Sequence, residues 1–200
     1  MTVSPQSATG SVHLTSAMVR ALAHPIRSQL LAALRTGGPA TASSLAAALG
    51  TNSGATSYHL RQLADVGLVV EDVERGNRRD RWWNAAHRSH SWHDTEHDRD
   101  PDDRAAADWL LRNAHRVYGR QVERWHDRRF EWPTAWRDAA DQSDFRIIVT
   151  ADELAELDRR LHAVIAEYGR DVDAAPDDAE AVTVILYMFP ADGTGAGHVR

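Results

Sequence analysis

The chain has 200 residues, of which 42% are hydrophobic and 26% are charged, and its formal net charge is −6. This balance is that of a globular protein and excludes a disordered or fibrous chain. The longest apolar run, residues 182–189, is far shorter than the roughly 18 residues of a membrane span, so no membrane partner is expected.

Cysteine is absent from the chain, which excludes disulfides, thiolate-bound metals and cysteine nucleophiles. The first residues show neither the basic start nor the apolar segment of a secretory signal. Both features are typical of a cytoplasmic protein.

The charges are distributed unevenly along the chain. Residues 1–64 contain no acidic residue, and residues 1–86 contain eight arginines against five acidic residues, a net charge of +3. The remaining residues contain 15 arginines against 24 acidic residues, a net charge of −9. This asymmetry predicts a basic module that binds an acidic partner, followed by an acidic module.

The first helices are predicted after a flexible leader at residues 1–13. One short helix is expected in LTSAMVRAL, and it ends before Pro25 because the residue before a proline disfavours the α conformation. Pro25 suits the first position of a second helix, which the glycines of RTGGP end. The apolar stripe of this second helix consists of Ile26, Leu30 and Leu34.

Two more short helices are predicted on either side of a tight turn. The first lies in TASSLAAALG, where Thr41 or Ser43 is an N-cap and Gly50 a C-terminal stop. The second lies in NSGATSYHLRQLADVG and ends at Gly67. Its buried face is predicted to consist of Thr56, Leu60 and Leu63, with His59 at the edge of that face. Two short helices joined in this way form a helix-turn-helix motif.

The segment GLVVEDVERGNRRDRWWN alternates like a β-hairpin with its turn at residues 74–77. A hairpin that directly follows the second helix of a helix-turn-helix is a wing. We therefore predict a winged helix-turn-helix domain over residues 14–86, mainly α with a β-hairpin.

The second helix of such a motif enters the major groove of double-stranded DNA. Successive residues of an α-helix are rotated by about 100°, which identifies the residues that point away from the buried face. Their side chains are small, polar or cationic. Arginine recognises guanine through two hydrogen bonds, and serine permits close approach. The predicted base-reading residues are Ser53, Gly54, Ser57, Tyr58 and Arg61.

Two further groups are predicted to contact the DNA backbone. Thr41 and Ser43 begin the preceding helix and offer hydroxyls to phosphate. The wing offers cations to the backbone or the minor groove. These wing residues are Arg75, Arg78, Arg79 and Arg81. The alternative is a winged helix that binds another protein instead of DNA.

The sequence ALAHPIRSQLLAAL, then LAAALGTNSGATSYHLRQLADVGLV and a basic hairpin ending in WWN, resembles ArsR-type winged helix-turn-helix repressors over residues 16–86. The matching features are the opening with its proline and arginine, the serine-containing helix with its HL pair, and the GLV entry to the wing. The resemblance implies a homodimeric repressor that binds an imperfect palindrome and associates with the nucleoid. It does not cover residues 87–200.

Members of that family often sense metals, so the histidines require attention. His115 and His126 have the spacing of the family's second metal site, which lies on the dimerisation helix, but Asn113 and Arg129 replace its other ligands. A second group, at spacings of three, three and four, consists of His87, His90, His93 and His97. We interpret both groups as solvated side chains, with a histidine-based metal sensor as the alternative. No cofactor is expected, and an effector has no identifiable chemistry.

The second half begins with a predicted linker at residues 87–101. Asp100 and Pro101 then begin a long helix that extends to about residue 129, because aspartate is a good N-cap and proline fits the first position. Its apolar positions are predicted to pack against the same helix of a second copy. These positions are Leu110, Ala114, Val117, Tyr118 and Trp125.

A small α+β region completes the predicted dimerisation and effector region, residues 102–190. Residues 145–150 and 182–189 are predicted strands, and Thr150 with Glu153 forms a capping box for the helix between them. Residues 191–200 are predicted to be disordered. The tryptophans of this half belong either to core and dimer contacts or to a ligand pocket: Trp109, Trp125, Trp132 and Trp136.

The sequence favours no enzyme. GATSYH lacks the lysine of a phosphate-binding loop, and the chain has neither a G-x-S-x-G elbow nor an H-E-x-x-H zinc motif. A metallohydrolase built on His87, His90 and His93 is the only concrete enzymatic alternative.

Overall fold

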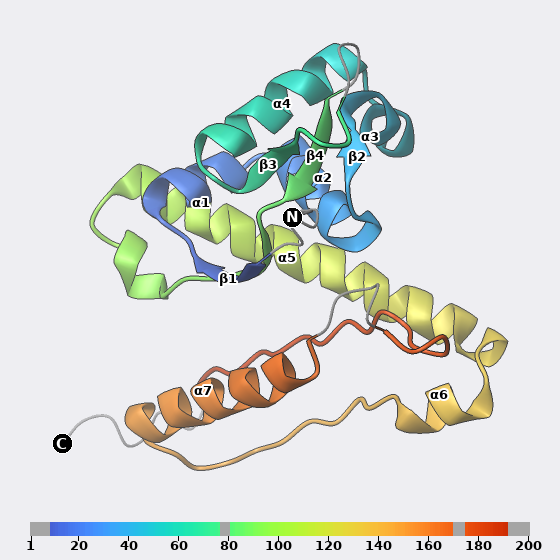
Figure 1. Cartoon of the computed structure of the whole chain (residues 1–200). Helices are drawn as coiled ribbons and strands as arrows, with labels where there is room; N and C mark the ends of the chain where they lie inside the picture. Colours follow the sequence, from blue (N-terminus) through green and yellow to red (C-terminus); the bar gives the residue numbers. More distant parts are fainter. Residues whose placement is uncertain (1–8, 77–80, 170–174, 192–200) are drawn as a thin grey trace, which may run out of the picture. The chain divides into compact units, whose positions relative to one another are not determined.

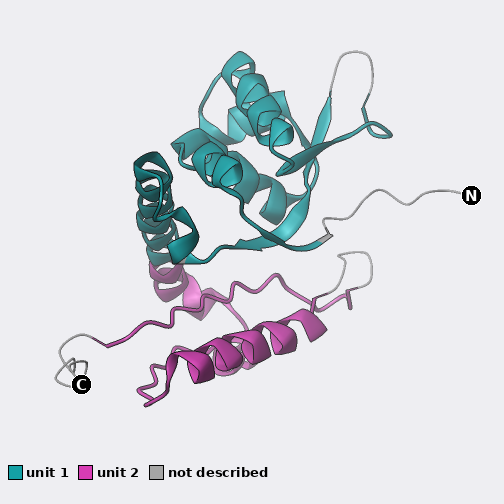
Figure 2. Cartoon of the chain, turned by 90° about the vertical axis from the view of Figure 1, so that its left-hand side faces the viewer, with its two compact units in different colours: residues 1–120 teal, residues 121–200 magenta. Residues whose placement is uncertain are grey.

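The chain divides into two units, residues 1–120 and residues 121–200 (Figure 2). The computed structural model describes residues 9–76, 81–169 and 175–191. The predicted N-terminal leader up to residue 8 and the predicted tail from residue 192 lie outside these ranges. None of the described helices combines the length and the apolar character of a transmembrane span.

Four helices of the first unit begin and end at residues that favour helix boundaries, such as N-caps, a proline and glycines (Figure 1). They are α1 (Ser16–Leu22), α2 (Pro25–Gly37), α3 (Ala42–Leu49) and α4 (Ser53–Asp65). His24 caps α2, because its Nδ1 accepts a hydrogen bond from the backbone N–H of Ile26 at 3.2 Å. Gly50 ends α3 at a φ of 64°, a left-handed conformation that glycine adopts without steric cost.

A small antiparallel sheet forms the wing. It contains β2 (Ala40–Thr41), β3 (Val69–Asp72) and β4 (Trp82–Ala85), in the order β2-β4-β3. The hairpin register pairs Glu71 with Trp83. The predicted hairpin is therefore confirmed, and residues 77–80 between its strands lie outside the described part of the chain.

The core of the first unit lies between these helices and the sheet. Leu30, Leu60 and Leu63 are each 0% exposed, and Leu34 is 1% exposed, as the helical spacing predicts. Ile26 and Leu49 are only partly buried against this core. The start of the long helix α5 (Pro101–Arg128) contributes to the same core through Ala106, Ala107 and Leu110.

Leu110, one of the predicted dimer contacts, packs into the core of its own domain. The side chain is 6% exposed in the single chain, because α5 packs against its own domain at this point. Helical spacing identifies an apolar face, but it does not distinguish a contact within the chain from a contact with a second copy.

The segment predicted as a linker is ordered structure. Strand β1 (Thr9–His13) pairs in parallel with β5 (His87–Ser91), and a 3₁₀ helix, η1 (Asp94–His97), follows. Residues 9–13 of the predicted leader are accordingly also a strand. Main-chain hydrogen bonds hold two polar segments together without an apolar pattern, so the polar composition misled the prediction.

The second unit contains the end of α5, the 3₁₀ helix η2 (Arg129–Glu131), α6 (Thr134–Ala139) and α7 (Ala151–Glu167). The capping box of Thr150 and Glu153 is present as predicted. The strands predicted at residues 145–150 and 182–189 do not form, and both segments have an irregular backbone. A strand requires a second backbone to pair with, and the described residues supply none here.

Candidate nucleic-acid interface

Helix α4 is anchored by its buried face and by its N-cap. Thr56, Leu60 and Leu63 are each 0% exposed, as predicted. The side chain of Asn52 accepts a hydrogen bond from the backbone N–H of Ala55 at 2.8 Å. Sequence reasoning missed this cap, although asparagine just before an apolar helical pattern is a known signal for one. The helix therefore has a fixed orientation on the domain.

The residues predicted to read bases lie on the other side of α4. Ser53, Gly54, Tyr58 and Arg61 are exposed, and Tyr58 retains 53% of its surface. Ser57 is only half-buried. The Nε of Arg61 donates to the carbonyl of Ser57 at 3.1 Å, which aligns the side chain along the helix and leaves the outer guanidinium nitrogens available.

His59 packs inward, at the edge of the buried face. Its ring lies 4.5 Å from that of His24 and 5.3 Å from that of Tyr58, centre to centre. Burial, reinforced by the charge of Arg27, lowers the pKa of both His24 and His59 below the ordinary value. Both imidazole rings therefore favour the neutral state. The Tyr58 ring packs against the ring of His59.

At the start of α3, two hydroxyls take part in a capping box and a third is exposed. Thr41 and Ser44 form a capping box, in which the Thr41 oxygen accepts from the Ser44 backbone N–H at 3.1 Å. Ser43 is exposed. The sequence prediction named Thr41 and Ser43 but missed Ser44, whose hydroxyl accepts from the backbone N–H of Thr41.

The wing arginines of the described chain face acidic neighbours. Arg75 lies 3.5 Å from Asp72, and Arg81 lies 3.6 Å from Glu71. The side chains of both arginines are half-exposed or more, so these ion pairs are weak and exchange readily for a phosphate. Arg78 and Arg79, also predicted as DNA contacts, lie outside the described residues.

The candidate histidine groups do not converge. His90 lies on β5, where its Nδ1 is 2.6 Å from a guanidinium nitrogen of Arg35. His97 belongs to η1 and is 2% exposed. On α5, His115 and His126 are eleven positions apart, which separates them by about 16 Å along the axis. Within the described ranges, no three histidine or acidic side chains are placed to hold a metal ion.

The arrangement of α2, α3 and α4 with the sheet of β2, β3 and β4 defines a winged helix-turn-helix domain. Residues 22–72 match the sequence profile of a family described as a helix-turn-helix domain. The winged helix-turn-helix fold and the helix-turn-helix motif predicted from the sequence are thus confirmed.

Several solved structures are similar to this chain at low sequence identity. Reduced HlyU from Vibrio cholerae is 22% identical over 51% of this chain and 85% of that chain, with a TM-score of 0.32. A homodimeric winged helix-turn-helix DNA-binding domain from Mycobacterium bovis, Mb0332, described as a possible ArsR-family transcriptional regulator, is 22% identical over 51% and 80%, with a TM-score of 0.33.

A mutant of ZitR from Lactococcus lactis in apo form is 12% identical over 74% of this chain and 84% of that chain, with a TM-score of 0.33. No curated protein matches the chain.

Proposed function

We propose that this protein is a sequence-specific, double-stranded DNA-binding repressor of the ArsR type that acts as a homodimer on an inverted repeat. The observation that carries the proposal is the exposed face of α4. Ser53, Tyr58 and Arg61 are open to solvent on a helix whose opposite face is completely buried. A rigid helix with hydroxyl and guanidinium groups on its outer face fits the major groove.

Each part of the domain has a role in the proposed complex. Ser53, Gly54, Ser57, Tyr58 and Arg61 set the sequence preference. Ser43 and the N-terminus of α3 donate hydrogen bonds to phosphates. The wing arginines neutralise phosphates, so the affinity falls steeply with salt. Residues 1–64, which contain α3 and all of α4 except its last residue, Asp65, include no acidic residue to oppose the DNA. A repressor of this kind acts at the nucleoid, in the cytoplasm.

The proposed dimer contact involves the exposed side of α5 beyond Leu110. Ala114, Val117 and Tyr118 recur at helical spacing and are half-buried in the single chain. Packing of two such helices against each other removes this remaining apolar surface from water. A two-fold dimer presents two copies of α4 to half-sites about 34 Å apart.

The decisive experiment is selection of genomic fragments by the purified full chain, followed by a search for an inverted repeat. Arg61→Ala is expected to abolish enrichment of the repeat, whereas Arg112→Ala, which removes an exposed arginine of α5, leaves it unchanged. Arg61 is exposed and lies outside the core, so the fold and the oligomeric state of the variant are expected to stay intact. Equal retention by both variants would contradict DNA reading by α4 and favour a protein partner.

A further inference from the structure

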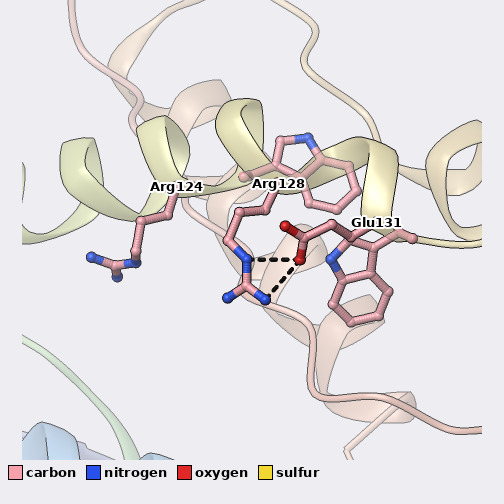
Figure 3. A pocket seen from close by; sticks show the side chains of 5 residues that line it. Arg124, Arg128 and Glu131 are labelled. Carbon is pink, nitrogen blue, oxygen red and sulfur yellow. Dashed lines mark hydrogen bonds and ion pairs between the residues drawn. The ribbon is translucent and has the colours of Figure 1, made fainter.

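The second unit contains a cleft that the proposed DNA-binding function does not use. It lies at the end of α5 and is an open hollow of about 430 Å³, a volume within the range of small-molecule sites (Figure 3). Its lining combines two aromatic and three charged side chains, all within twelve residues of one another: Arg124, Trp125, Arg128, Glu131 and Trp132.

The aromatic side chains form an apolar wall. The indole rings of Trp125 and Trp132 are 6.3 Å apart and tilted by 50°. Trp136 lies 6.1 Å beyond Trp132 in a T-shaped contact and supports it from the other side. All three are half-buried, so each ring retains an accessible portion. A flat ring is attracted to such a wall by offset or edge-on contacts at 4.5–7 Å.

The charges of the cleft do not cancel. Arg128 donates two hydrogen bonds to one carboxylate oxygen of Glu131, at 2.9 and 2.8 Å. This pairing lowers the pKa of Glu131, so the carboxylate is ionised and neutralises Arg128. Arg124 extends from the same side of α5 (Figure 3) and forms no ion pair with any described residue. The cleft therefore has one uncompensated positive charge.

We infer that this cleft binds a small planar aromatic monoanion, such as an aromatic carboxylate. The ring packs against Trp125 and Trp132, and Arg124 donates to the carboxylate through its planar guanidinium. Glu131 opposes a second negative charge on the ligand, which restricts the class to monoanions. A role for this ligand as an effector rests on the proposed regulatory function, whereas its binding does not.

Isothermal titration of the full chain with 2-naphthoate tests the site. Binding with one ligand per chain is expected, and it should be weaker by about tenfold or more for 2-naphthamide, which lacks the charge, and for decahydro-2-naphthoate, which lacks the aromatic ring. Binding that is absent at millimolar concentration, or equal for the three compounds, overturns the proposal.

Variants of exposed residues separate recognition from folding. Arg124→Gln is expected to weaken 2-naphthoate binding by about tenfold, and Arg112→Gln, the matched control on the same helix, to leave it unchanged. Glu131→Gln is expected to admit 2,6-naphthalenedicarboxylate, which the unmodified cleft rejects. Indistinguishable affinities for the two arginine variants would overturn the site. Retention of genomic DNA, measured on the same preparations, reports separately on the proposed function.

Discussion

At the scale of single residues, Arg35 and His90 form a partly buried contact without a carboxylate. Arg35 donates to the carbonyl of His87 at 2.9 Å, and His90 accepts from it through Nδ1. Burial lowers the pKa of Arg35 to about 10. Burial, followed by the charge of Arg35, lowers the pKa of His90 to about 4. Because His90 is neutral, its Nδ1 can accept a hydrogen bond from the charged Arg35, and this bond joins β5 to α2.

This contact predicts a loss of stability in acid. Between pH 6.5 and pH 4 the unfolded chain binds a proton at His90 that the folded chain does not, so the free energy of unfolding falls as the pH falls. The loss from this one group approaches ~3 kcal/mol. Urea unfolding at a series of pH values measures it.

The lowered pKa values of His24 and His59 act in the same direction. The variant His90→Asn keeps an acceptor for Arg35 but does not titrate, and its stability should depend less on pH. An unchanged pH dependence in that variant would argue against this role of His90.

Thr56 has a hydroxyl oxygen that is buried without a hydrogen-bond partner among the described residues. A buried polar group in this state costs free energy, and valine has nearly the same shape without it. Thr56→Val is therefore expected to raise the free energy of unfolding by about 1 kcal/mol. Thermal or urea unfolding measures the change, and destabilisation would show that the hydroxyl has a partner in solution.

At the scale of elements, the start of α5 is fixed to α1 by charge. The side chain of Asp100 caps the helix by accepting from the backbone N–H of Asp102 at 2.8 Å. Arg20 pairs with Asp100 at 3.1 Å and with Asp103, whose pKa this contact lowers. The element proposed to form the dimer is therefore attached to the helices that present α4.

Removal of either partner in this ion pair should destabilise the first unit. Arg20→Gln and Asp103→Asn are each expected to lower the midpoint of thermal unfolding, and the double variant to lower it by less than the two effects added together. The coupling arises because each single variant leaves a charge without its partner. Strict additivity in the double-variant cycle would show that the two side chains do not interact.

The elements also show what the sequence reveals about structure. Helices α2, α3, α4 and α7 follow from caps, proline and apolar spacing, all of which act within a few residues. The pairing of β1 with β5 joins segments more than 70 residues apart through main-chain bonds between polar residues, so no local pattern reports it. At residues 182–189 an apolar run predicted a strand, but pairing depends on a neighbouring backbone that composition does not reveal.

The exposed face of α4 was predictable because helix geometry, like the capping signals, acts within a few residues. The outward face of α4 follows from its inward face once the helix is identified, so the exposure of Ser53, Tyr58 and Arg61 could be derived from the sequence. The ion pairs of the wing arginines and the inward packing of His59 against His24 depend on contacts between elements. No local sequence pattern reports such contacts, so they could be identified only from the structure.

At the scale of the whole molecule, charge is divided between a basic N-terminal part and an acidic remainder. Residues 1–86 have a net charge of +3, although the complete chain has a net charge of −6. Long-range repulsion between the acidic part and DNA is screened by salt, as is the attraction of the basic face. The overall charge therefore gives no reliable indication of DNA binding, whereas its distribution does.

Affinity for the selected inverted repeat, measured by fluorescence anisotropy at several salt concentrations, tests the central claim most directly. We predict that Arg61→Ala weakens specific binding by about tenfold to a hundredfold, that Arg112→Ala does not, and that affinity falls steeply with salt for the unmodified protein. Equal affinity of the two variants for the repeat, with no dependence on salt, would contradict DNA recognition by α4.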